Sequence, residues 1–298
     1  MKNGSKVSVL MNCYNSELYI RESVQSLIDQ TYKDWELIVW DDASIDSTIN
    51  IIQSFNDNRI KIYKNDAHCG LCLGRIRAQK FLKGEYISIL DSDDIYEKDK
   101  LKNQIQAFNI DPNLSLVTSW YSKINENGKE LKKIKFSKNL SKIKNELFGD
   151  NIFAHSSIMY KRSEAEKVGW YSDKLEYSQD YDLTIKLLQN NPFCIVENYL
   201  VKIRDSASSM TRKLSLQGLI IKEHLEILNY LKDNFALNSK QKKINKKNIK
   251  IVNFKILIYN FQKSPNIQKL FNIFLLLMGR PSLIINLFKN IFIRFKNF

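Results

Sequence analysis

Short apolar runs separated by mixed segments fill the first third of the chain. Four runs have the length and the β-branched and aromatic residues typical of strands, and they cover Val7–Met11, Trp35–Trp40, Arg59–Tyr63 and Tyr86–Leu90. The connections between them are short and contain apolar positions at helical spacing. The pattern predicts a βαβαβαβ order, and therefore a mainly parallel α/β sheet flanked by helices on both faces.

The apolar positions of these connections predict three helices. Ser16 is the expected N-cap of the first helix, whose apolar positions are Ile20, Val24, Leu27 and Ile28. The second helix carries Ile51, Ile52 and Phe55, and the third lies near residues 73–82. Each helix would return the chain to the start of the next parallel strand.

The pattern changes after about residue 114. Leu114–Tyr121 is strand-like, and Asn127-Gly128 is a strong hairpin turn signal. Residues 152–163 are expected to form a strand with His155 at its start, 168–189 a loop entering a helix, and 193–201 a late strand. Residues 136–150 are polar and give no clear pattern.

Polar side chains follow three of the four predicted strands at the point where each strand ends. Asn12 and Tyr14 follow the first run, Asp41 and Asp42 the second, and the sequence Asp91-Ser92-Asp93-Asp94 the fourth. In open α/β sheets, ligands bind outside the carboxyl ends of the strands. We therefore expect these groups to meet in one crevice, although each taken singly is also explained as a polar turn.

The carboxylates after the fourth run repel one another and resist burial, so a cation is expected beside them. An all-oxygen site suits Mg²⁺ or Mn²⁺ better than zinc, and Mg²⁺ sites usually include substrate phosphates. The sequence therefore predicts a phosphorylated ligand, plausibly a nucleotide. Tyr14 would stack on its base, Asp42 would accept a base N–H, and Arg75 would hold a phosphate.

Four segments in this order resemble the family 2 glycosyltransferases: "VSVLMNCYN", "QSLIDQTYKDWELIVWDDASIDST", "GLCLGR" and "GEYISILDSDD". The resemblance covers residues 6 to about 96, continues more loosely to about 211, and does not include the basic tail. It implies a GT-A (Rossmann-like) fold with a mixed, mainly parallel sheet. It also implies an inverting enzyme that uses a nucleotide-sugar donor.

The resemblance also implies roles for particular residues. Asp93 would ligate the metal directly, Asp91 would lie nearer the ribose or the metal-bound waters, and Asp94 would support them. The general base would be Asp180, whereas Asp182 is expected to be structural. The nucleotide-sugar site would comprise Asn12, Tyr14, Asp41, Asp42, Arg75, Asp91 and Ser92.

Several positions depart from the family pattern. Asn12-Cys13 stands where Pro-Thr is common, and Ile76 stands where an Asn commonly follows the loop arginine. Gln179 replaces a glutamate beside the expected base, which removes one carboxylate there. His155 occupies the place of a common acceptor-side histidine, where it would contact the metal or diphosphate, or would instead be a structural histidine.

The charge divides the chain near residue 211. Residues 1–211 carry no net charge, whereas residues 212–298 carry the whole excess of +14. We therefore expect a GT-A domain over 1–211, with a nucleotide-sugar-binding half (1–96) and an acceptor half (97–211). Residues 212–298 would form a basic, amphipathic α-helical region.

The basic region allows two interpretations. Residues 238–298 combine lysine-rich and apolar stretches, which suit an anionic membrane surface. They also suit a helical lid with a solvated face. No nucleic-acid-binding motif is present, so no nucleic acid partner is expected.

No signal peptide or uncharged run of spanning length is evident in the sequence, and four cysteines are too few for a disulfide framework. We therefore expect reduced thiols and a cytoplasmic protein, with a peripheral place on the inner membrane as an option. Cys69 and Cys72 form a CxxC next to His68, but no second such pair completes a zinc site.

The expected activity is transfer of a sugar, most readily from a UDP-sugar, to a hydroxyl of a glycan or a lipid-linked acceptor in bacterial surface polysaccharide or glycoconjugate synthesis. A nucleotidyltransferase would need a Gly-rich phosphate loop after the first strand, which "NCYNSE" lacks. The alternative outside enzymes is a catalytically silent nucleotide-sugar or membrane-binding protein. The sequence leaves the donor sugar, the acceptor and the oligomeric state open.

Overall fold

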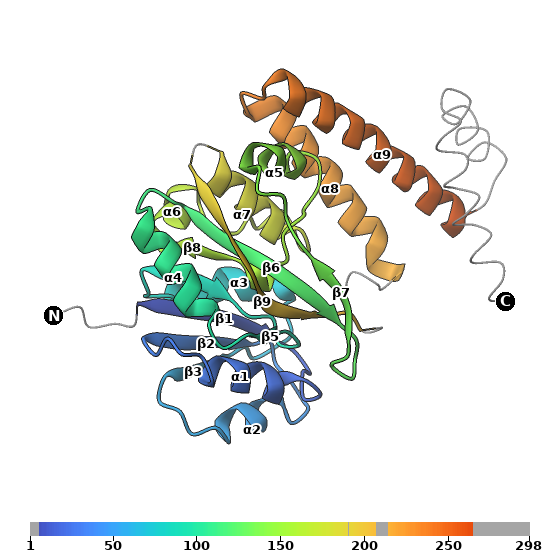
Figure 1. The fold of residues 1–298 in the computed structure, drawn as a ribbon. Helices are drawn as coiled ribbons and strands as arrows, with labels where there is room; N and C mark the ends of the chain where they lie inside the picture. The colour runs from blue at the N-terminus through green and yellow to red at the C-terminus, as the bar shows by residue number, and fades with distance from the viewer. Residues whose placement is uncertain (1–5, 190, 207–213, 265–298) are drawn as a thin grey trace. The chain divides into compact units, whose positions relative to one another are not determined.

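A computed structural model describes residues 6–189, 191–206 and 214–264 of the chain. The chain divides into two compact units, Met1–Lys213 and Leu214–Phe298. The first unit contains the sheet, and the described part of the second consists of two helices (Figure 1).

Four parallel strands form the first half of the sheet, in the order β3-β2-β1-β4. Their bounds are β1 Val7–Cys13, β2 Trp35–Asp41, β3 Ile60–Lys64 and β4 Tyr86–Ile89. Val7 pairs with both Trp35 and Tyr86, so β1 is fully enclosed by neighbours. These strands are the four apolar runs of the sequence, and their prediction is confirmed.

The sheet continues through β8, β6 and β9 to β5. The bounds are β5 Ile95–Tyr96, β6 Leu116–Ile124, β7 Glu130–Ile134, β8 Met159–Lys161 and β9 Phe193–Arg204. β8 is antiparallel to β4 and β6, whereas β9 is parallel to β6. The result is the mixed, mainly parallel sheet that was predicted.

Helices flank this sheet (Figure 1). Their bounds are α1 Ile20–Ile28, α2 Thr48–Gln53, α3 Leu71–Ala78, α4 Lys100–Ile110, α5 Leu140–Leu147, α6 Arg162–Lys167 and α7 Gln179–Leu188. Two 3₁₀ turns, η1 Gln79–Phe81 and η2 His155–Ser157, complete the unit. The largest apolar cluster lies between β1, β2, α1 and α4 and includes Met11, Trp35, Leu27 and Phe108.

Ser16 does not cap α1, so that prediction is wrong. The N-cap is Tyr19, and the carbonyl of Ser16 instead accepts the Ile20 N–H at 3.0 Å. The Ser16 hydroxyl lies 3.0 Å from that of Ser92. A polar turn between β1 and α1 therefore uses this serine to contact the loop that follows β4.

The second half of the unit differs more from the expectations. The predicted strand at 152–163 is reduced to β8, because η2 precedes it and α6 begins at Arg162. The uninterpreted segment 136–150 contains α5, and α4 was not predicted at all. The hairpin prediction is confirmed, since β6 and β7 pair around Gly128, whose φ is +77°.

The second unit contains α8 (Leu214–Asn234) and α9 (Ser239–Lys263). The two helices are antiparallel: the Asn245 side-chain amide donates to the Leu228 carbonyl at 2.9 Å, and Gly218 lies against Tyr259. A Cβ at Gly218 would meet the tyrosine ring at 2.3 Å, so glycine allows this close approach. The apolar segments 270–278 and 282–295 lie outside the described residues.

No helix in the described ranges is both long enough and apolar enough to cross a bilayer.

Candidate active site

The polar groups predicted to meet do lie at one edge of the sheet. The Asp42 backbone N–H donates to the Cys13 carbonyl at 2.9 Å, and the Leu90 N–H donates to the Leu10 carbonyl at 3.0 Å. These bonds align the carboxyl ends of β1, β2 and β4. The edge therefore presents two acidic sequences, Asp41-Asp42 and Asp91–Asp94, on either side of β1.

The three carboxylates after β4 differ in their surroundings. Asp94 is buried and anchored, since its two oxygens accept the Ser156 hydroxyl at 2.6 Å and the Arg204 backbone N–H at 2.9 Å. Asp91 keeps 40% of its side chain exposed. No side chain of the described residues donates a hydrogen bond to the Asp93 carboxylate. Asp91 and Asp93 are therefore the carboxylates that remain available for a ligand.

Burial and the neighbouring charge of Asp91 raise the pKa of Asp93 to about 6. Burial and the charges of Asp93 and Asp91 also raise the pKa of Asp94. The pKa of Asp91 is lowered: burial opposes its ionisation, but His155 and Arg75 favour it. The loop therefore holds more negative charge than the protein compensates.

A hard divalent cation fits this loop. Asp91 and Asp93 offer oxygen ligands, and a cation would relieve the repulsion that raises the pKa of Asp93. Within the described residues, no group of three or more His, Cys, Asp or Glu side chains is arranged to hold a metal. A Mg²⁺-type site uses one or two carboxylates and completes its shell with water and phosphate oxygens.

Two residues that the sequence did not single out hold in place the segment Asp91–Asp94, called the acidic loop below. The Ser156 hydroxyl accepts the Asp91 N–H at 3.0 Å while donating to Asp94. Arg204 is buried at the end of β9 and donates through Nε to the Asp93 carbonyl at 2.9 Å. Both arrive from distant parts of the sequence, so no local motif could have identified them.

Arg75, His155 and Tyr171 form a buried cluster next to Asp91. Arg75 Nη2 lies 3.1 Å from His155 Nδ1, and Tyr171 Oη lies 3.4 Å from His155 Nε2. The same Nδ1 lies 3.7 Å from Asp91 Oδ1, so this imidazole nitrogen faces both the guanidinium and the carboxylate. The Nη1 atom of Arg75 has no hydrogen-bond partner within the described part of the chain. It is an unsatisfied buried donor suited to an anionic ligand.

Asp180 lies in the first turn of α7. Its Oδ2 accepts from the Asn151 side chain at 2.8 Å. Burial raises the pKa of Tyr171 to about 12, and the charges of Asp180 and Asp91 both add to this effect. Asp180 and Asp91 therefore both act electrostatically on this one tyrosine.

Gln179 has no role as a second acid in this arrangement. It is fully buried and donates to the Ser172 carbonyl at 2.7 Å and to the Cys72 sulfur at 3.1 Å. These bonds join α7 to α3 and to the preceding loop. Asp182, the expected structural residue, forms an ion pair with Lys186 at 2.6 Å.

Asp42 is saturated by hydrogen bonds in this structure. Its two oxygens accept the Gly70 N–H at 2.8 Å, the Cys69 N–H at 3.0 Å and the Asn65 amide at 3.1 Å. His68 Nδ1 approaches at 2.8 Å. Asp41 is also buried and binds the Ser44 N–H with both oxygens. Asp41 thus fixes the turn that follows β2, and Asp42 fixes the loop before α3.

Tyr14 provides an exposed aromatic surface near Asp42. Its ring stacks on that of His68 with 4.0 Å between centroids. Behind it, Asn12 packs against α3 at Gly74, where a Cβ would lie 2.8 Å from the Asn12 amide nitrogen. Glycine therefore allows α3 to approach the carboxyl ends of β1 and β2. His68 is a further candidate for base stacking that the sequence did not reveal.

The two cysteines of the CxxC face different partners. Cys69 Sγ lies 3.0 Å from Asp42 Oδ1, and burial together with this carboxylate raises the pKa of the thiol to about 11. Cys72 Sγ receives the Gln179 amide. Cys69 is thus a protonated thiol in the Asp42 network, and Cys72 joins helices.

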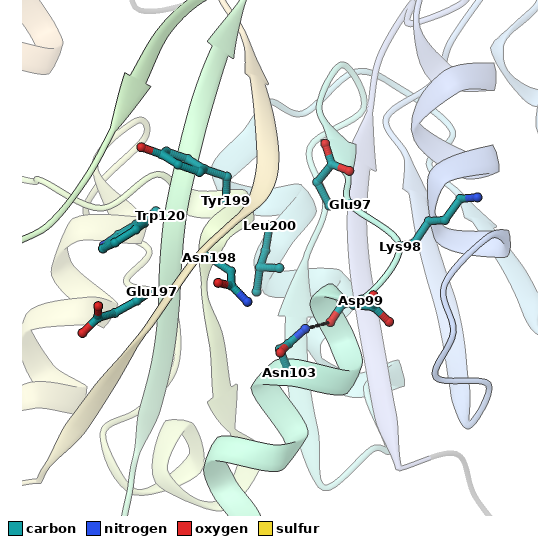
Figure 2. Close-up of a pocket in the computed structure, with 9 residues that line it drawn as sticks. All are labelled: Glu97, Lys98, Asp99, Asn103, Trp120, Glu197, Asn198, Tyr199 and Leu200. Carbon is teal, nitrogen blue, oxygen red and sulfur yellow. Dashed lines mark hydrogen bonds between the residues drawn. The ribbon is translucent and has the colours of Figure 1, made fainter.

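A cavity of about 480 Å³ lies elsewhere in the first unit, between the start of α4 and strands β6 and β9 (Figure 2). Trp120 and Tyr199 lie beside each other there, with ring centroids 5.5 Å apart. Its remaining lining residues are Glu97, Lys98, Asp99, Asn103, Glu197, Asn198 and Leu200. None of the acidic-loop residues lines this cavity. The candidate active site is therefore identified by its charged side chains and not by the volume of a pocket.

The model of glycosyl transferase family 2 matches residues 8–169, which is more than half of the chain. The chain belongs to this family. It is therefore a glycosyltransferase, and the expected family membership is confirmed.

Known relatives agree with this assignment. A glycosyltransferase of Methanocaldococcus jannaschii, MJ1057, is 36% identical over 66% of this chain and 70% of its own length. The chain also matches TuaG of Bacillus subtilis, named for teichuronic acid biosynthesis, at 27% identity over 76% of this chain and 90% of TuaG. The Escherichia coli glucosyltransferase WfgD, named for a diphosphoundecaprenol acceptor, is 40% identical over 41% of this chain and 47% of WfgD. The chain spans only 31–65% of the length of several Rickettsia relatives.

Solved structures show the same fold. Staphylococcus aureus TarS (residues 1–349), solved with UDP-GlcNAc, superposes with a TM-score of 0.68 at 19% identity, covering 91% of this chain and 79% of that one. The mannosyltransferase PcManGT of Pyrobaculum calidifontis, solved with GDP-Man and Mn²⁺, gives 0.64 at 15% identity, covering 94% and 82%. The GT-A fold prediction is confirmed.

Proposed function

We propose that the chain transfers a sugar from a nucleotide-sugar, a UDP-sugar in the first place, to a hydroxyl of a glycan or lipid-linked acceptor, with inversion at the anomeric carbon. Residues 1–211 would be the catalytic domain, with donor binding by 1–96 and acceptor binding by 97–211. The observation that supports this most is the undercompensated Asp91–Asp93 pair beside an unsatisfied Arg75.

On the donor side, Asp91 and Asp93 would hold Mg²⁺ or Mn²⁺, which would neutralise charge on the donor diphosphate. Arg75 would donate its free Nη1 N–H groups to a phosphate oxygen, and His155 keeps the guanidinium in place. Tyr14 would stack on the base. Ser92, tied to Ser16, would lie against the ribose and diphosphate.

On the acceptor side, Asp180 would take the proton of the attacking hydroxyl. The acceptor oxygen forms a bond to the anomeric carbon as the bond from that carbon to the phosphate oxygen breaks. The nucleoside diphosphate leaves with the bonding electron pair. The Asn151 amide donates to Asp180 and holds the carboxylate for this attack. A single displacement needs no second nucleophile.

We further propose that the acceptor belongs to bacterial surface polysaccharide synthesis. The relatives named for teichuronic acid and for a diphosphoundecaprenol acceptor support this proposal. A lipid-linked acceptor lies at a membrane, and residues 238–298 would contact its anionic cytoplasmic face. The excess charge of +14 in the last 87 residues supports that placement.

Donor binding tests this function directly. Purified full-length protein would be screened by thermal shift and donor hydrolysis against UDP-, GDP- and dTDP-sugars, with and without Mn²⁺ or Mg²⁺. We expect one nucleotide class to stabilise the protein only when metal is present, and Asp93→Ala to remove that effect. No stabilisation by any donor would instead favour the catalytically silent binding protein.

The base assignment has its own test. Asp180→Asn should lower the rate of transfer by about 10²–10⁴-fold without changing the affinity for the donor. Asp182→Asn removes a carboxylate from the same helical turn and should retain the rate within a few fold. Equal rates for wild type and Asp180→Asn would remove Asp180 from the mechanism.

A further inference from the structure

A pocket of about 500 Å³ lies within the second unit, where α8 turns into α9. Four lysines line it, Lys232 from α8 and Lys242, Lys246 and Lys250 from α9. The other lining residues are Asn229, Leu237, Asn245 and Ile249, and no carboxylate is among them. The pocket is therefore strongly cationic around an amide and apolar interior.

The three α9 lysines stand on successive turns, at i, i+4 and i+8, about 6 Å apart along the axis. Like charges at this spacing destabilise a helix. All three are exposed, and no ion pair in the described part of the chain neutralises them. Lys232 pairs only with Asp233, at 3.3 Å. An anion between these lysines would relieve their mutual repulsion.

The turn that shapes the pocket is fixed by its own hydrogen bonds. Asn238 and Gln241 form a capping box, with bonds of 3.0 and 2.9 Å between each side chain and the other's N–H. Asn245, buried, binds the Leu228 carbonyl across the two helices. The backbone positions that carry the four lysines are therefore set by the protein itself.

The apolar residues in the lining favour an anion that also has an apolar part. Leu237 and Ile249 form part of the interior, and α9 continues as the apolar segment 251–261 beyond its lysine-rich start. A phosphate attached to a hydrocarbon chain would satisfy both features. Single-stranded nucleic acid stacks its bases on aromatic rings, and no aromatic residue lines this pocket.

We propose that this pocket binds the phosphate of an anionic membrane lipid, with Lys232, Lys242, Lys246 and Lys250 around the headgroup. The pocket adds a specific lipid contact to the general attraction between the positively charged residues 238–298 and an anionic membrane. It rests on the proposed membrane role of this region, and not on the identity of the donor or the acceptor.

Vesicle sedimentation of the full-length protein tests the site, with phosphatidylglycerol/phosphatidylcholine vesicles and pure phosphatidylcholine vesicles as probes. The pocket variant is Lys242→Gln/Lys246→Gln/Lys250→Gln. The matched control is Lys240→Gln/Lys243→Gln/Lys247→Gln, which removes the same charge from exposed positions of the same helix outside the pocket.

We expect the pocket variant to lose about a hundredfold in partition to the anionic vesicles, and the control to lose less than about fivefold. Equal losses in the two variants would show diffuse charge attraction and overturn the pocket. Wild-type binding to neutral vesicles as tight as to anionic ones would also overturn it. If inorganic phosphate at millimolar concentration removed all vesicle binding, the pocket would be a site for free phosphate and not for a lipid.

Circular dichroism and metal-dependent donor stabilisation of both variants separate this outcome from failure of the proposed function. Both variants should keep wild-type helix content and donor stabilisation, because the substituted lysines belong to the second unit and the proposed donor residues to the first. If the pocket variant lost binding to a DNA or RNA duplex while retaining vesicle binding, the ligand would be nucleic acid and the lipid proposal would be wrong.

Discussion

Two acidic sequences end β2 and β4, the strands on either side of β1, and the protein treats them in opposite ways. Asp42 after β2 accepts hydrogen bonds from Gly70, Cys69 and Asn65. Although burial opposes ionisation, the donors of Cys69, Gly70 and Asn65 lower the pKa of Asp42. No side chain in the described part of the chain donates to the Asp93 carboxylate, and burial with the charge of Asp91 raises its pKa to about 6.

The difference indicates which carboxylates serve the fold and which serve a ligand. A carboxylate with its donors supplied by the protein stabilises the loop that supplies them. A carboxylate crowded by another and left without donors costs stability until a cation arrives. The sequences "WDD" and "LDSDD" do not reveal this distinction, because the donors come from distant segments.

The largest expected effect is on catalysis. Asp93→Asn should lower metal-dependent turnover by about a thousandfold, since several kcal/mol of transition-state stabilisation is lost with the metal ligand. In the absence of metal, its midpoint of thermal unfolding should equal or exceed that of wild type. The exposed Asp66→Asn is the control for a lost charge. If the unfolding midpoint of metal-free Asp93→Asn fell markedly below that of metal-free wild type, Asp93 would be a residue that stabilises the fold, as Asp42 is.

The next effect is on stability. Asp42→Ala should lower the free energy of unfolding by about 2–3 kcal/mol, because buried N–H donors of Cys69 and Gly70 lose their acceptor. Urea denaturation of the metal-free protein measures it. If Asp42 stabilises the fold and Asp93 does not, the loss of unfolding free energy in Asp42→Ala exceeds the loss in Asp93→Ala measured in the same way. The reverse order would show that the loop after β4 is the structural one.

A smaller effect concerns the serine that frames the acidic loop. Ser156→Ala should weaken the affinity for Mn²⁺ by about tenfold, because the orientation of Asp91 and Asp94 depends on its hydroxyl. Ser157→Ala is matched, since Ser157 is equally buried but binds Thr118 and the Ala154 carbonyl instead. Calorimetric titration of Mn²⁺ measures both. Equal affinities in the two variants would mean that Ser156 is only a packing residue.

The smallest effect is the pH dependence of the Asp42 network. Because the folded-state pKa is below the ordinary value of 3.8, the stabilisation is present above that pH and is lost as pH falls through the folded value. The difference in unfolding free energy between wild type and Asp42→Asn should therefore be constant from pH 7 to 5 and shrink below about pH 4. A difference that did not change with pH would assign the effect to packing.

The sequence predicted the donor half of the site better than the acceptor half. The four apolar runs became β1 to β4 within two residues, because buried parallel strands need continuous apolar runs and show them clearly. Strand β5 has only two residues, so its pattern is too short to detect, and the strand predicted over 152–163 is much longer than the three-residue β8. Helix α4 has its apolar positions Leu101, Ile105 and Phe108 at helical spacing, but that spacing predicts a helix without fixing where it packs.

The sequence by itself determined the order of the elements along the first half of the chain, the meeting of three strand ends at one edge, and the composition boundary near residue 211. These follow from local periodicity and charge. Only the tertiary structure decided which carboxylates are satisfied, because Ser156, Arg204, His155 and Tyr171 lie 60 to more than 110 residues from Asp91–Asp94. Hydrogen bonds and desolvation act through space, so the chemical availability of an aspartate depends on neighbours that its own segment does not encode.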